Sequence, residues 1–551
     1  MTIERAGEFR VAMAQMNVTV GAIEENAARI IEVIEQARDD FGADLVVFPE
    51  LIITGYPPED LLLREELYQR LEVVLEKIVN ACSGIDALVS HPILSEDNLI
   101  YNAVTHISNG LAVKSYCKRI LPNYGVFDEA RYFTPMVNSP IFEIAGITCG
   151  IMICEDGWSA EVAQEAKETG AQILIQINAS PYRSGKFEER LEIAKLRVSE
   201  TNLPLISVYL VGGQDSLLFD GHSFVMDSQG EVTHELPSFK EQLALISFES
   251  LPSLSPDIPT AWIPAAPERR VPVLREAEMY EALVLGLFDY VDKNNFEKVL
   301  IGLSGGIDSA LVLSLAFDAL GPERVTAVLM PSRYTSEMSN TDAMEMIINL
   351  GVNYKIISIE PLFQTALKTL SESFAGTEPD ITEENLQARC RGLIMMGLSN
   401  KFGDLVLTTG NKSEMAVGYA TLYGDMAGGF APIKDVYKTD VYALAHYRNS
   451  VSEMIPERII MRPPSAELRE NQTDQDSLPD YEILDAILKL YIEEDMDALS
   501  IAAKGFDVEL VSKVIGLIKR SEYKRRQSAI GVKMSSRAFD KDWRYPITSG
   551  F

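Results

Sequence analysis

The sequence predicts an α/β fold in two halves. Short apolar runs alternate with segments of helical spacing before residue 251, and the same alternation returns after residue 272. Six of the chain's 26 prolines lie between these positions, and proline favours extended backbone. A chain of 551 residues has room for at least two domains. We expect one domain over 1–250, a proline-rich connector over 251–272 and a second domain over 273–551.

The first half is expected to be a layered structure of strands and helices. Helical composition indicates helices at Asn26–Asp39 and Glu161–Thr169. Alternating strands and helices pack as layers around a common core. The expected strands are Arg10–Gln15, Asp44–Phe48, Ala87–Ser90, Ile147–Ile153, Ile173–Ile177 and Leu205–Val211.

The second half predicts a doubly wound parallel sheet. Strands are expected at Lys298–Leu303 and Arg324–Leu329. Strands that are joined through helices run parallel, with helices on both faces of the sheet. The expected helices are Glu276–Lys293, Asp308–Leu320 and Asn340–Leu350.

Composition excludes several classes of protein. The formal net charge of −32 opposes a nucleic-acid or anionic-membrane partner, because both require a basic surface. No apolar run reaches the roughly 18 residues of a membrane helix, and the N-terminus lacks the apolar stretch of a signal peptide. The five cysteines and five histidines show neither zinc-type spacing nor a disulfide framework. We therefore expect a soluble cytoplasmic protein.

Cys154 is the first candidate for catalysis. It ends the apolar run ITCGIMIC and is followed by acidic residues, and α/β folds place reactive groups at strand ends. A lone cysteine is more often a buried core residue, and Cys149 in mid-strand fits that description. A reactive thiol needs a base or a positive partner, and no histidine lies near in sequence.

Glu50 and Lys118 are the candidate partners of this cysteine. Glu50 closes the run DLVVFPE, and Lys118 lies in VKSYCKRILPNYG. A carboxylate can accept the thiol proton, and an ammonium can stabilise an oxyanion. Taken singly, each is more often a solvated surface charge.

Together these segments resemble the nitrilase/amidase superfamily. The resemblance rests on FPEL, K-x-x-LPNYGVFDE-x-RYF and ICED-x-W, and extends from about Arg10 to Met226. It implies an α-β-β-α sandwich with a catalytic triad of Glu50, Lys118 and Cys154.

A narrower resemblance concerns the amide substrate. LPNYGVFDEARYF and NASPYRSGK are similar to the glutaminase domain of glutamine-dependent NAD synthetases. That implies that Tyr124, Ser180 and Lys186 bind L-glutamine, although an ordinary turn at Ser180 would also fit the spacing.

The run KVLIGLSGGIDSA predicts a strand, a phosphate-binding loop and the start of a helix. Glycines let the backbone approach an anion, while serine hydroxyls and helix N–H groups donate to it. The loop lacks the Walker lysine and is not GxGxxG. SGGIDS resembles the pyrophosphate loop of N-type ATP pyrophosphatases, which have an adenine nucleotide alpha hydrolase-like fold. The resemblance implies ATP contacts at Gly302, Leu303, Ser304, Gly305, Gly306, Ile307, Asp308, Ser309 and Thr409.

A magnesium site is expected beside this loop. Asp308 and Glu414 are carboxylates that together suit Mg²⁺, which prefers oxygen ligands and phosphate oxygens. Glu414 alone would more often be an acid at a helix N-terminus. The segments DLVLTTGNKSEMAVGYATLYGD, ENLQARCRG, GDMAGGFAPIKDVYKTD, RPPSAELR and EYKRRQ resemble NAD synthetases. They imply deamido-NAD contacts at Asn385, Glu414, Asp435 and Lys524.

One segment departs from the acidic average. Residues 519–544 contain nine basic and three acidic residues, a local balance of +6. A basic surface tail is the plain interpretation, and a wall of counter-charges for nucleotide phosphates is the sharper one. Nucleic acid is the alternative for this segment taken alone.

The whole chain resembles glutamine-dependent NAD synthetases. The resemblance implies that glutamine is hydrolysed in the first half and that ammonia passes through the protein. The second half would use ATP to convert the nicotinate carboxylate of deamido-NAD into an acyl adenylate. Ammonia would then displace AMP to give NAD. Adenylation is required because an unactivated carboxylate would have to expel oxide. The resemblance also implies a homo-oligomer.

Three alternatives remain at this stage. Another glutamine-dependent adenylating amidotransferase, such as a GMP synthetase, has a Cys-His-Glu glutaminase, which the FPEL and ICED segments oppose. A nitrilase-type amidase with a non-catalytic nucleotide module is opposed by Asp308, Thr409 and Glu414. A non-catalytic acidic scaffold predicts no thiol reactivity above background.

Overall fold

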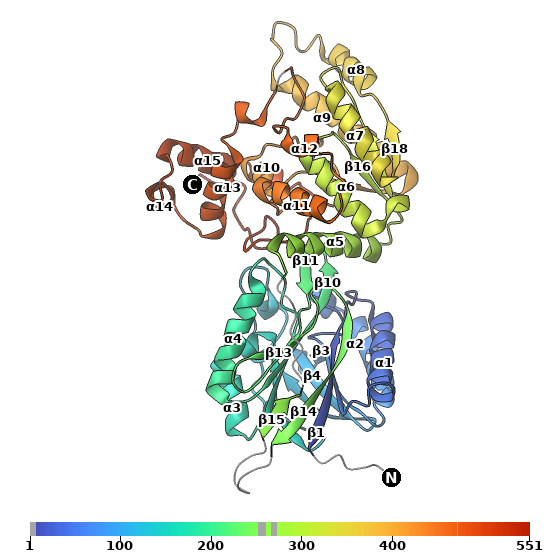
Figure 1. The fold of residues 1–551 in the computed structure, drawn as a ribbon, viewed down its shortest axis with the longest axis vertical. Coiled ribbons are helices and arrows are strands. Elements are labelled where there is room, and N and C mark those ends of the chain that lie inside the picture. Colours follow the sequence, from blue (N-terminus) through green and yellow to red (C-terminus); the bar gives the residue numbers. More distant parts are fainter. Residues whose placement is uncertain (1–6, 252–260, 266–272, 471, 551) are drawn as a thin grey trace. The chain divides into compact units, whose positions relative to one another are not determined.

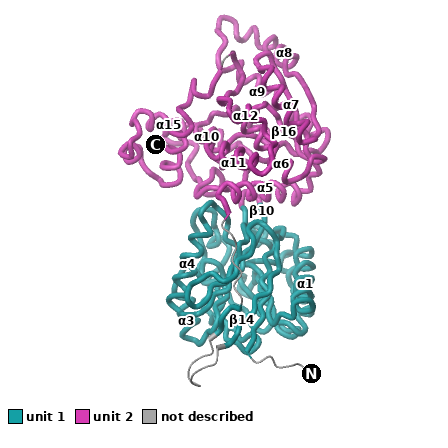
Figure 2. Tube along the Cα trace, in the orientation of Figure 1, with its two compact units in different colours: residues 1–214, 218–272 teal, residues 215–217, 273–551 magenta. Residues whose placement is uncertain are grey.

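The computed structural model describes residues 7–251, 261–265, 273–470 and 472–550, which divide into two compact units (Figure 2). Unit 1 comprises 1–214 and 218–272, and unit 2 comprises 215–217 and 273–551. Part of the expected connector is a strand, β15 (Ala261–Pro264), which pairs antiparallel with β14 (Gln242–Leu251). The connector segments 252–260 and 266–272 lie outside the described residues.

Unit 1 contains two large sheets. The first has the strand order β15-β14-β1-β2-β3-β4-β5 and the second β13-β12-β9-β8-β7-β6. The first sheet adds β1 (Glu8–Gln15), β2 (Leu45–Val47), β3 (Asp86–Leu94), β4 (Ile100–Ser108) and β5 (Leu111–Cys117). The second comprises β6 (Ile141–Ile144), β7 (Ile147–Ile153), β8 (Ile173–Asn178), β9 (Leu205–Tyr209), β12 (Phe224–Met226) and β13 (Val232–Glu235). A small separate sheet pairs β10 (Val211–Gln214) with β11 (Leu217–Asp220).

Helices cover the outer faces of the two sheets (Figure 1). α1 (Ile23–Asp39) and α2 (Glu65–Ala81) lie on one side, and α3 (Ala160–Glu168) and α4 (Lys186–Thr201) on the other. Val47 of the first sheet and Ile151 and Ile175 of the second belong to one buried core. This arrangement confirms the expected α-β-β-α sandwich, because each helix and sheet buries one apolar face.

The expected strands are present, with one difference. β7 has the predicted bounds, but the run over 205–211 is divided between β9 and β10. Leu210 N donates to Asn178 O in the second sheet, whereas Val211 N donates to Met16 O. The chain therefore changes hydrogen-bonding partners at this point, a change that an apolar run does not signal.

Unit 2 is built on a parallel sheet in the order β18-β17-β16-β19, which confirms the expected doubly wound fold. Because β17 and β19 lie on opposite sides of β16, the strand order reverses there, and such points form binding crevices. The strands are β16 (Val299–Gly302), β17 (Val325–Leu329), β18 (Asn353–Ile356) and β19 (Leu405–Leu407). The helices between or before them are α5 (Arg275–Lys293), α6 (Ile307–Leu320), α7 (Glu337–Leu350), α8 (Glu360–Leu370) and α9 (Ile381–Phe402).

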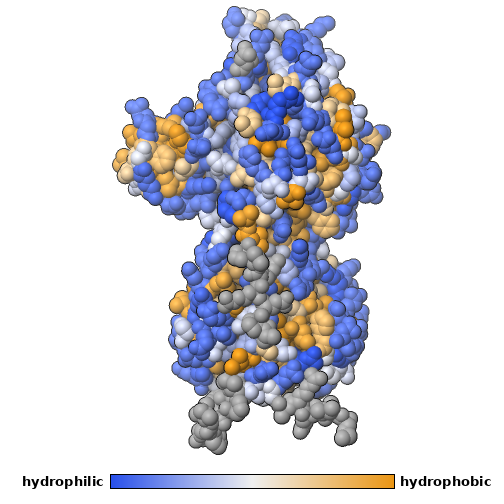
Figure 3. Space-filling model, viewed as in Figure 1, coloured by the Kyte–Doolittle hydropathy of each residue, from blue (hydrophilic) through white to orange (hydrophobic). Residues whose placement is uncertain are grey.

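The rest of unit 2 is helical and has a core of its own. Buried side chains from α10, α13 and α15 pack together, with Trp543 among them. In Figure 3 apolar residues gather over the α14–α15 part of the surface. None of the described helices has both the length and the apolarity needed to cross a membrane. The elements are α10 (Lys412–Val417), α11 (Lys438–Val451), α12 (Glu457–Met461), α13 (Tyr481–Leu488), α14 (Ala498–Ala503), α15 (Val508–Arg520) and α16 (Glu522–Arg525).

Candidate functional site

Cys154 lies at the turn where β7 ends. It begins the short 3₁₀ helix Cys154–Trp158 and has φ of 46°, a left-handed conformation that is unfavourable for a side chain with Cβ. Gln176 Nε2 donates to Cys154 O at 2.9 Å, and Ile153 N donates to the Asp156 carboxylate at 3.1 Å. These bonds hold the turn, and such strain gathers at functional sites.

Glu50 and Lys118 lie together in the same buried centre. Lys118 Nζ donates to Glu50 Oε1 at 2.8 Å, and both side chains are 0% exposed. Glu50 Oε2 accepts a bond from Ala179 N at 2.9 Å. The Cys154 thiol lies within electrostatic range of both Glu50 and Lys118.

Glu129 completes this centre, and sequence reasoning did not assign it. Lys118 Nζ donates to Glu129 Oε1 at 2.8 Å and to Oε2 at 2.9 Å, while Tyr56 Oη donates to Oε1 at 2.8 Å. Glu129 is the last residue of LPNYGVFDE, so the signal lay inside the motif, but a single glutamate gives no indication of its burial.

The charges of this centre are strongly perturbed. Burial, reinforced by the charge of Glu50, raises the pKa of the Cys154 thiol well above its usual value. Burial also acts against the Lys118 ammonium, but Glu129 and Glu50 outweigh it and raise the pKa of Lys118. Burial raises the pKa of Glu129 to about 7. The cysteine therefore rests as a neutral thiol and needs a base to become a nucleophile.

Two of the three expected glutamine-binding residues, Tyr124 and Lys186, contact the turn that Cys154 begins. Tyr124 Oη donates to the Glu155 carboxylate at 3.1 Å. Lys186 Nζ lies 4.0 Å from the ring centroid of Trp158, and burial lowers the pKa of this lysine. Ser180 is buried, and its carbonyl accepts a bond from Arg190 Nη2 at 2.8 Å.

Unit 2 contains a cavity of about 500 Å³ at the switch point of its sheet. Every expected ATP-binding residue lines it: Gly302, Leu303, Ser304, Gly305, Gly306, Ile307, Asp308, Ser309 and Thr409. A Cβ atom at Gly305 would lie 2.5 Å from Ser339 O, and its φ is +79°. Only glycine fits the loop at this position.

Asp308 and Glu414 converge in this cavity, together with a lysine that sequence reasoning missed. Lys438 Nζ is 1% exposed, donates to Asp308 Oδ2, and lies 3.4 Å from Glu414 Oε1. Burial raises the pKa of Glu414 to about 8. Lys438 lies in the quoted KDVYKTD motif, but its contact with the loop joins residues 130 positions apart.

The donor chemistry suits a magnesium ion that is shared with phosphates. Asn411 Nδ2 donates to Asp308 Oδ1 at 2.9 Å, which orients that carboxylate. No group of three or more His, Cys, Asp or Glu able to hold a metal occurs among the residues that the structure describes. Two carboxylates fit Mg²⁺, which commonly combines one or two carboxylates with substrate phosphates.

The expected deamido-NAD residues are divided between two environments. Asn385, Glu414 and Lys524 line the cavity. Asp435 does not; it is 5% exposed and pairs with Lys412 Nζ at 2.8 Å. Asp435 Oδ2 also accepts bonds from the backbone N atoms of Met534 and Ser535 at 2.8 and 2.7 Å.

Of the nine basic residues in 519–544, only Lys524 lines the cavity. Even Lys524 donates to the carbonyls of Gly418 and Ala420, both at 2.8 Å. Arg525 pairs with Glu522 at 2.8 Å and Lys533 with Asp542 at 2.6 Å. Most of the expected counter-charge wall is thus replaced by internal ion pairs and helix-capping contacts.

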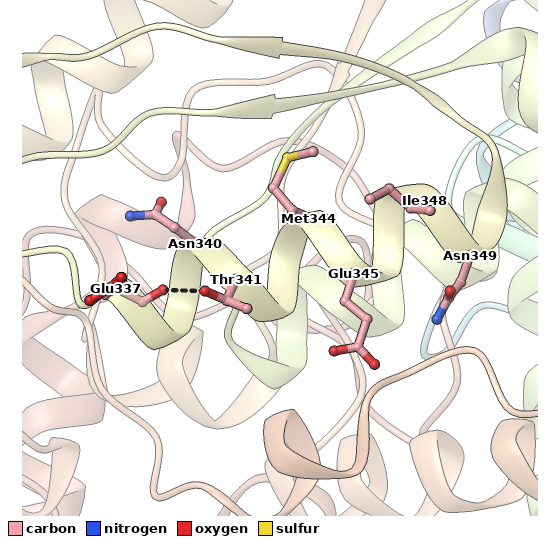
Figure 4. Close-up of a pocket in the computed structure, with 7 residues that line it drawn as sticks. All are labelled: Glu337, Asn340, Thr341, Met344, Glu345, Ile348 and Asn349. Carbon is pink, nitrogen blue, oxygen red and sulfur yellow. Dashed lines mark hydrogen bonds between the residues drawn. The ribbon is translucent and has the colours of Figure 1, made fainter.

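A second hollow, of about 550 Å³, lies along α7 (Figure 4). Its lining comes from that helix alone, and Ile348 in it is 70% exposed. Thr341 Oγ1 donates to the Glu337 carbonyl at 2.9 Å within the helix. The side chains follow one helix face and do not converge on a common point.

Comparisons with known proteins agree with this geometry. Residues 10–250 match the carbon-nitrogen hydrolase family and residues 279–528 match the NAD synthase family. The chain is 48% identical over 547 residues to a glutamine-dependent NAD(+) synthetase of Xylella fastidiosa, covering 98% of this chain and 99% of the relative. A synthetase of the same name from Thermotoga maritima is 47% identical over 571 residues, covering 98% of this chain and 99% of the relative.

A solved structure shows the same likeness. The glutamine-dependent NAD+ synthetase of Acinetobacter baumannii, determined in complex with ADP, matches with a TM-score of 0.78 and 45% identity, covering 98% of each chain.

A carbon–nitrogen hydrolase unit and a nucleotide-loop unit in one chain define a glutamine-using ligase. Sequence identity of 48% and 47% to these two relatives, over 98% of this chain, then identifies the particular family. This chain belongs to the glutamine-dependent NAD(+) synthetases.

Proposed function

We propose that this chain amidates deamido-NAD to NAD, using ATP and ammonia taken from glutamine. The observation that carries the proposal is the fully buried Glu50–Lys118–Glu129 cluster beside Cys154. Such a cluster serves covalent amide hydrolysis. It stands in the same chain as a phosphate-type loop that lines a cavity large enough for a nucleotide.

The first reaction is hydrolysis of the glutamine carboxamide. Glu50 takes the Cys154 proton as sulfur attacks the carbonyl carbon, and then passes that proton to the leaving ammonia. Lys118 donates to the tetrahedral oxyanion. Water that is activated by Glu50 cleaves the thioester to glutamate. Tyr124, Ser180 and Lys186 hold the amino-acid end of the substrate.

The second reaction is adenylation followed by amidation. The nicotinate carboxylate attacks the ATP α-phosphorus, which releases pyrophosphate and forms an acyl adenylate. Residues 302–309 and Thr409 bind ATP, and Lys438 counters phosphate charge when ATP displaces its contacts with Asp308 and Glu414. Ammonia then displaces AMP. Asn385 and Lys524 lie in the same cavity lining and are assigned to deamido-NAD.

Magnesium is part of this proposal. Asp308 and Glu414 would hold it, and the ion would neutralise charge on the phosphates. Asp435 is assigned a different task from the expected substrate contact: it anchors the segment at Met534 and Ser535.

The proposal also includes transfer of ammonia inside the protein, because free ammonia would be protonated and diluted. A homo-oligomer and a cytoplasmic location complete it. The five cysteines, all free and buried, suit a reducing compartment.

The test is one assay with three products. Purified protein receives deamido-NAD, Mg²⁺-ATP and glutamine, and NAD, AMP and glutamate are measured together. The proposal requires NAD and AMP in equal amounts, with at least as much glutamate. Release of ADP in place of AMP would exclude the adenylate route.

A further inference from the structure

Asn102 contacts two members of the Cys154 centre. It lies on β4 and is 1% exposed. Its side-chain Nδ2 donates to Glu50 Oε1 at 2.7 Å, and its backbone carbonyl accepts a hydrogen bond from Lys118 N at 2.8 Å. Neither residue is near Asn102 in sequence, so nothing in the sequence around Asn102 indicates these contacts.

The oxygen of the Asn102 side-chain amide has no such partner. Its Oδ1 is buried and has no hydrogen-bond partner in the structure. The orientation is nonetheless fixed by chemistry, because turning the amide would place Oδ1 against the Glu50 carboxylate oxygen. An unsatisfied buried acceptor is unfavourable for folding, and such an exception in a native protein calls for a functional explanation.

The two carboxylate oxygens of Glu50 accept different numbers of hydrogen bonds. Oε1 accepts from Lys118 Nζ and from Asn102 Nδ2, which uses both of its acceptor positions. Among the described residues, Oε2 accepts a hydrogen bond only from Ala179 N, at 2.9 Å. The remaining acceptor position of this carboxylate is therefore on Oε2.

We propose that Asn102 is a positioning residue for the general base: it occupies Glu50 Oε1 and leaves Oε2 as the atom that receives the Cys154 proton. The inference rests on the proposed role of Glu50. Without Asn102, Oε1 would also accept a proton, on the side of the carboxylate that faces Lys118.

Other charged and titratable groups face Glu50. These are Lys118, Glu129, Glu155, the Cys154 thiol and the Tyr56 hydroxyl, which donates to Glu129 at 2.8 Å. All of them remain when Asn102 is replaced. Asn102 supplies a neutral donor that is independent of Lys118, so its loss frees Glu50 Oε1 on one side without removing the ammonium.

The experiment uses the full-length protein with Asn102→Leu and the isosteric Asn102→Asp. For Asn102→Leu we expect glutamine-dependent kcat about tenfold lower and KM unchanged. We also expect the acid limb of the pH profile about one pH unit higher, a tenfold change in proton affinity. For Asn102→Asp we expect a larger upward shift, because a second carboxylate adjoins Glu50. NAD formation from added ammonia should stay unchanged in both.

Asn26→Leu is the matched control. Asn26 is 2% exposed, and its side-chain amide donates to Thr19 O and Ile53 O rather than to Glu50. It should lower the melting temperature and leave the pH profile in place. An unshifted acid limb in the Asn102 variants would overturn the inference, and Asn102→Asp decides it if Asn102→Leu does not fold.

Glu50→Gln separates this inference from the proposed function. If Glu50→Gln hydrolyses glutamine at the normal rate, the general base is wrongly assigned. If Glu50→Gln is inactive while both Asn102 variants keep the normal profile, only the positioning role fails.

Discussion

Cys154 and Cys149 share a strand region, and both are buried, yet their surroundings differ. Burial raises the pKa of both thiols. Only Cys154 has Glu50 and Lys118 in electrostatic range, whereas Cys149 lies in mid-strand within the core of unit 1. Burial alone therefore does not make a nucleophile; a base within reach does.

This contrast gives a prediction at the residue scale. Cys154→Ala should lower glutamine-dependent NAD formation by at least a thousandfold and abolish labelling by a glutamine-analogue electrophile, because the attacking sulfur is gone. Cys149→Ala should keep activity and labelling, with a lower melting temperature from the lost buried sulfur. Mass spectrometry of the labelled protein measures both, and label that persists in Cys154→Ala would refute the assignment.

Glu414 gives a prediction about pH and stability. Its pKa rises from 4.5 to about 8 on folding, so between these values the folded state holds a proton that the unfolded state has lost. This contribution is fully stabilising below about pH 4.5 and is lost as pH rises through about 8. As pH rises from about 4.5 to about 8, the melting temperature of ligand-free Glu414→Gln should therefore fall less steeply than that of the wild-type protein. Asp404→Asn, at a turn before β19, is the control that should keep the wild-type slope.

Single residues also mark where sequence reasoning stops. Glu50, Lys118 and Cys154 were expected, and the structure places them in one buried centre. Glu129 and Lys438 were missed although each lay in a quoted motif, because an isolated charge is assumed to be solvated until burial is known. Asp435 was expected to bind substrate, but it is enclosed by Lys412 and Ser535.

At the level of elements, the phosphate loop depends on one left-handed glycine. Gly305→Ala should abolish NAD synthesis from both ammonia and glutamine while glutamine hydrolysis persists. The added Cβ would lie 2.5 Å from Ser339 O, so the loop must shift. Gly321→Ala is the control, since its φ of +77° matches but no atom lies within 4 Å. It should cost about 1–3 kcal/mol of stability, because Gly321 has ψ of 163°, and should keep activity. Equal activity in the two variants would contradict the loop assignment.

Elements with strong apolar periodicity were predictable. β7 and the helices after the phosphate loop were found within a few residues of expectation. The sequence pattern does not predict the separate helices from α10 to α16. Several of these helices are short and depend on long-range contacts, as when Arg525 Nη1 donates to Ala416 O at 2.6 Å. Local propensity carries little information about such helices.

At the scale of the whole molecule, two chemistries are carried by one chain and must share ammonia. With glutamine turning over, the proposed internal transfer of ammonia requires that added ¹⁵N-ammonium label only a small fraction of the NAD. With Cys154→Ala, the same ammonium should label NAD fully. Mass spectrometry of NAD reports both. Full labelling in the wild-type protein during glutamine turnover would show that ammonia equilibrates with solvent.

The whole-molecule charge was a poor guide to the synthetase site. The −32 total gave no sign of the Lys438 ammonium beside the phosphate loop. The +6 segment in turn overstated the positive charge there, because Glu522 and Asp542 neutralise Arg525 and Lys533. Net charge is a sum over a surface, whereas a nucleotide site depends on a few oriented groups.

The burial of Cys154 also bears on survival under oxidative stress. Peroxides and common alkylating reagents attack thiolates that are exposed to solvent, whereas Cys154 is 3% exposed and burial raises the pKa of its thiol. The glutaminase centre should therefore tolerate oxidants that inactivate enzymes with acidic cysteines. An inhibitor with the shape of glutamine would meet the sulfur only where Glu50 can activate it. Selectivity would then come from substrate mimicry, so a weakly electrophilic warhead should suffice.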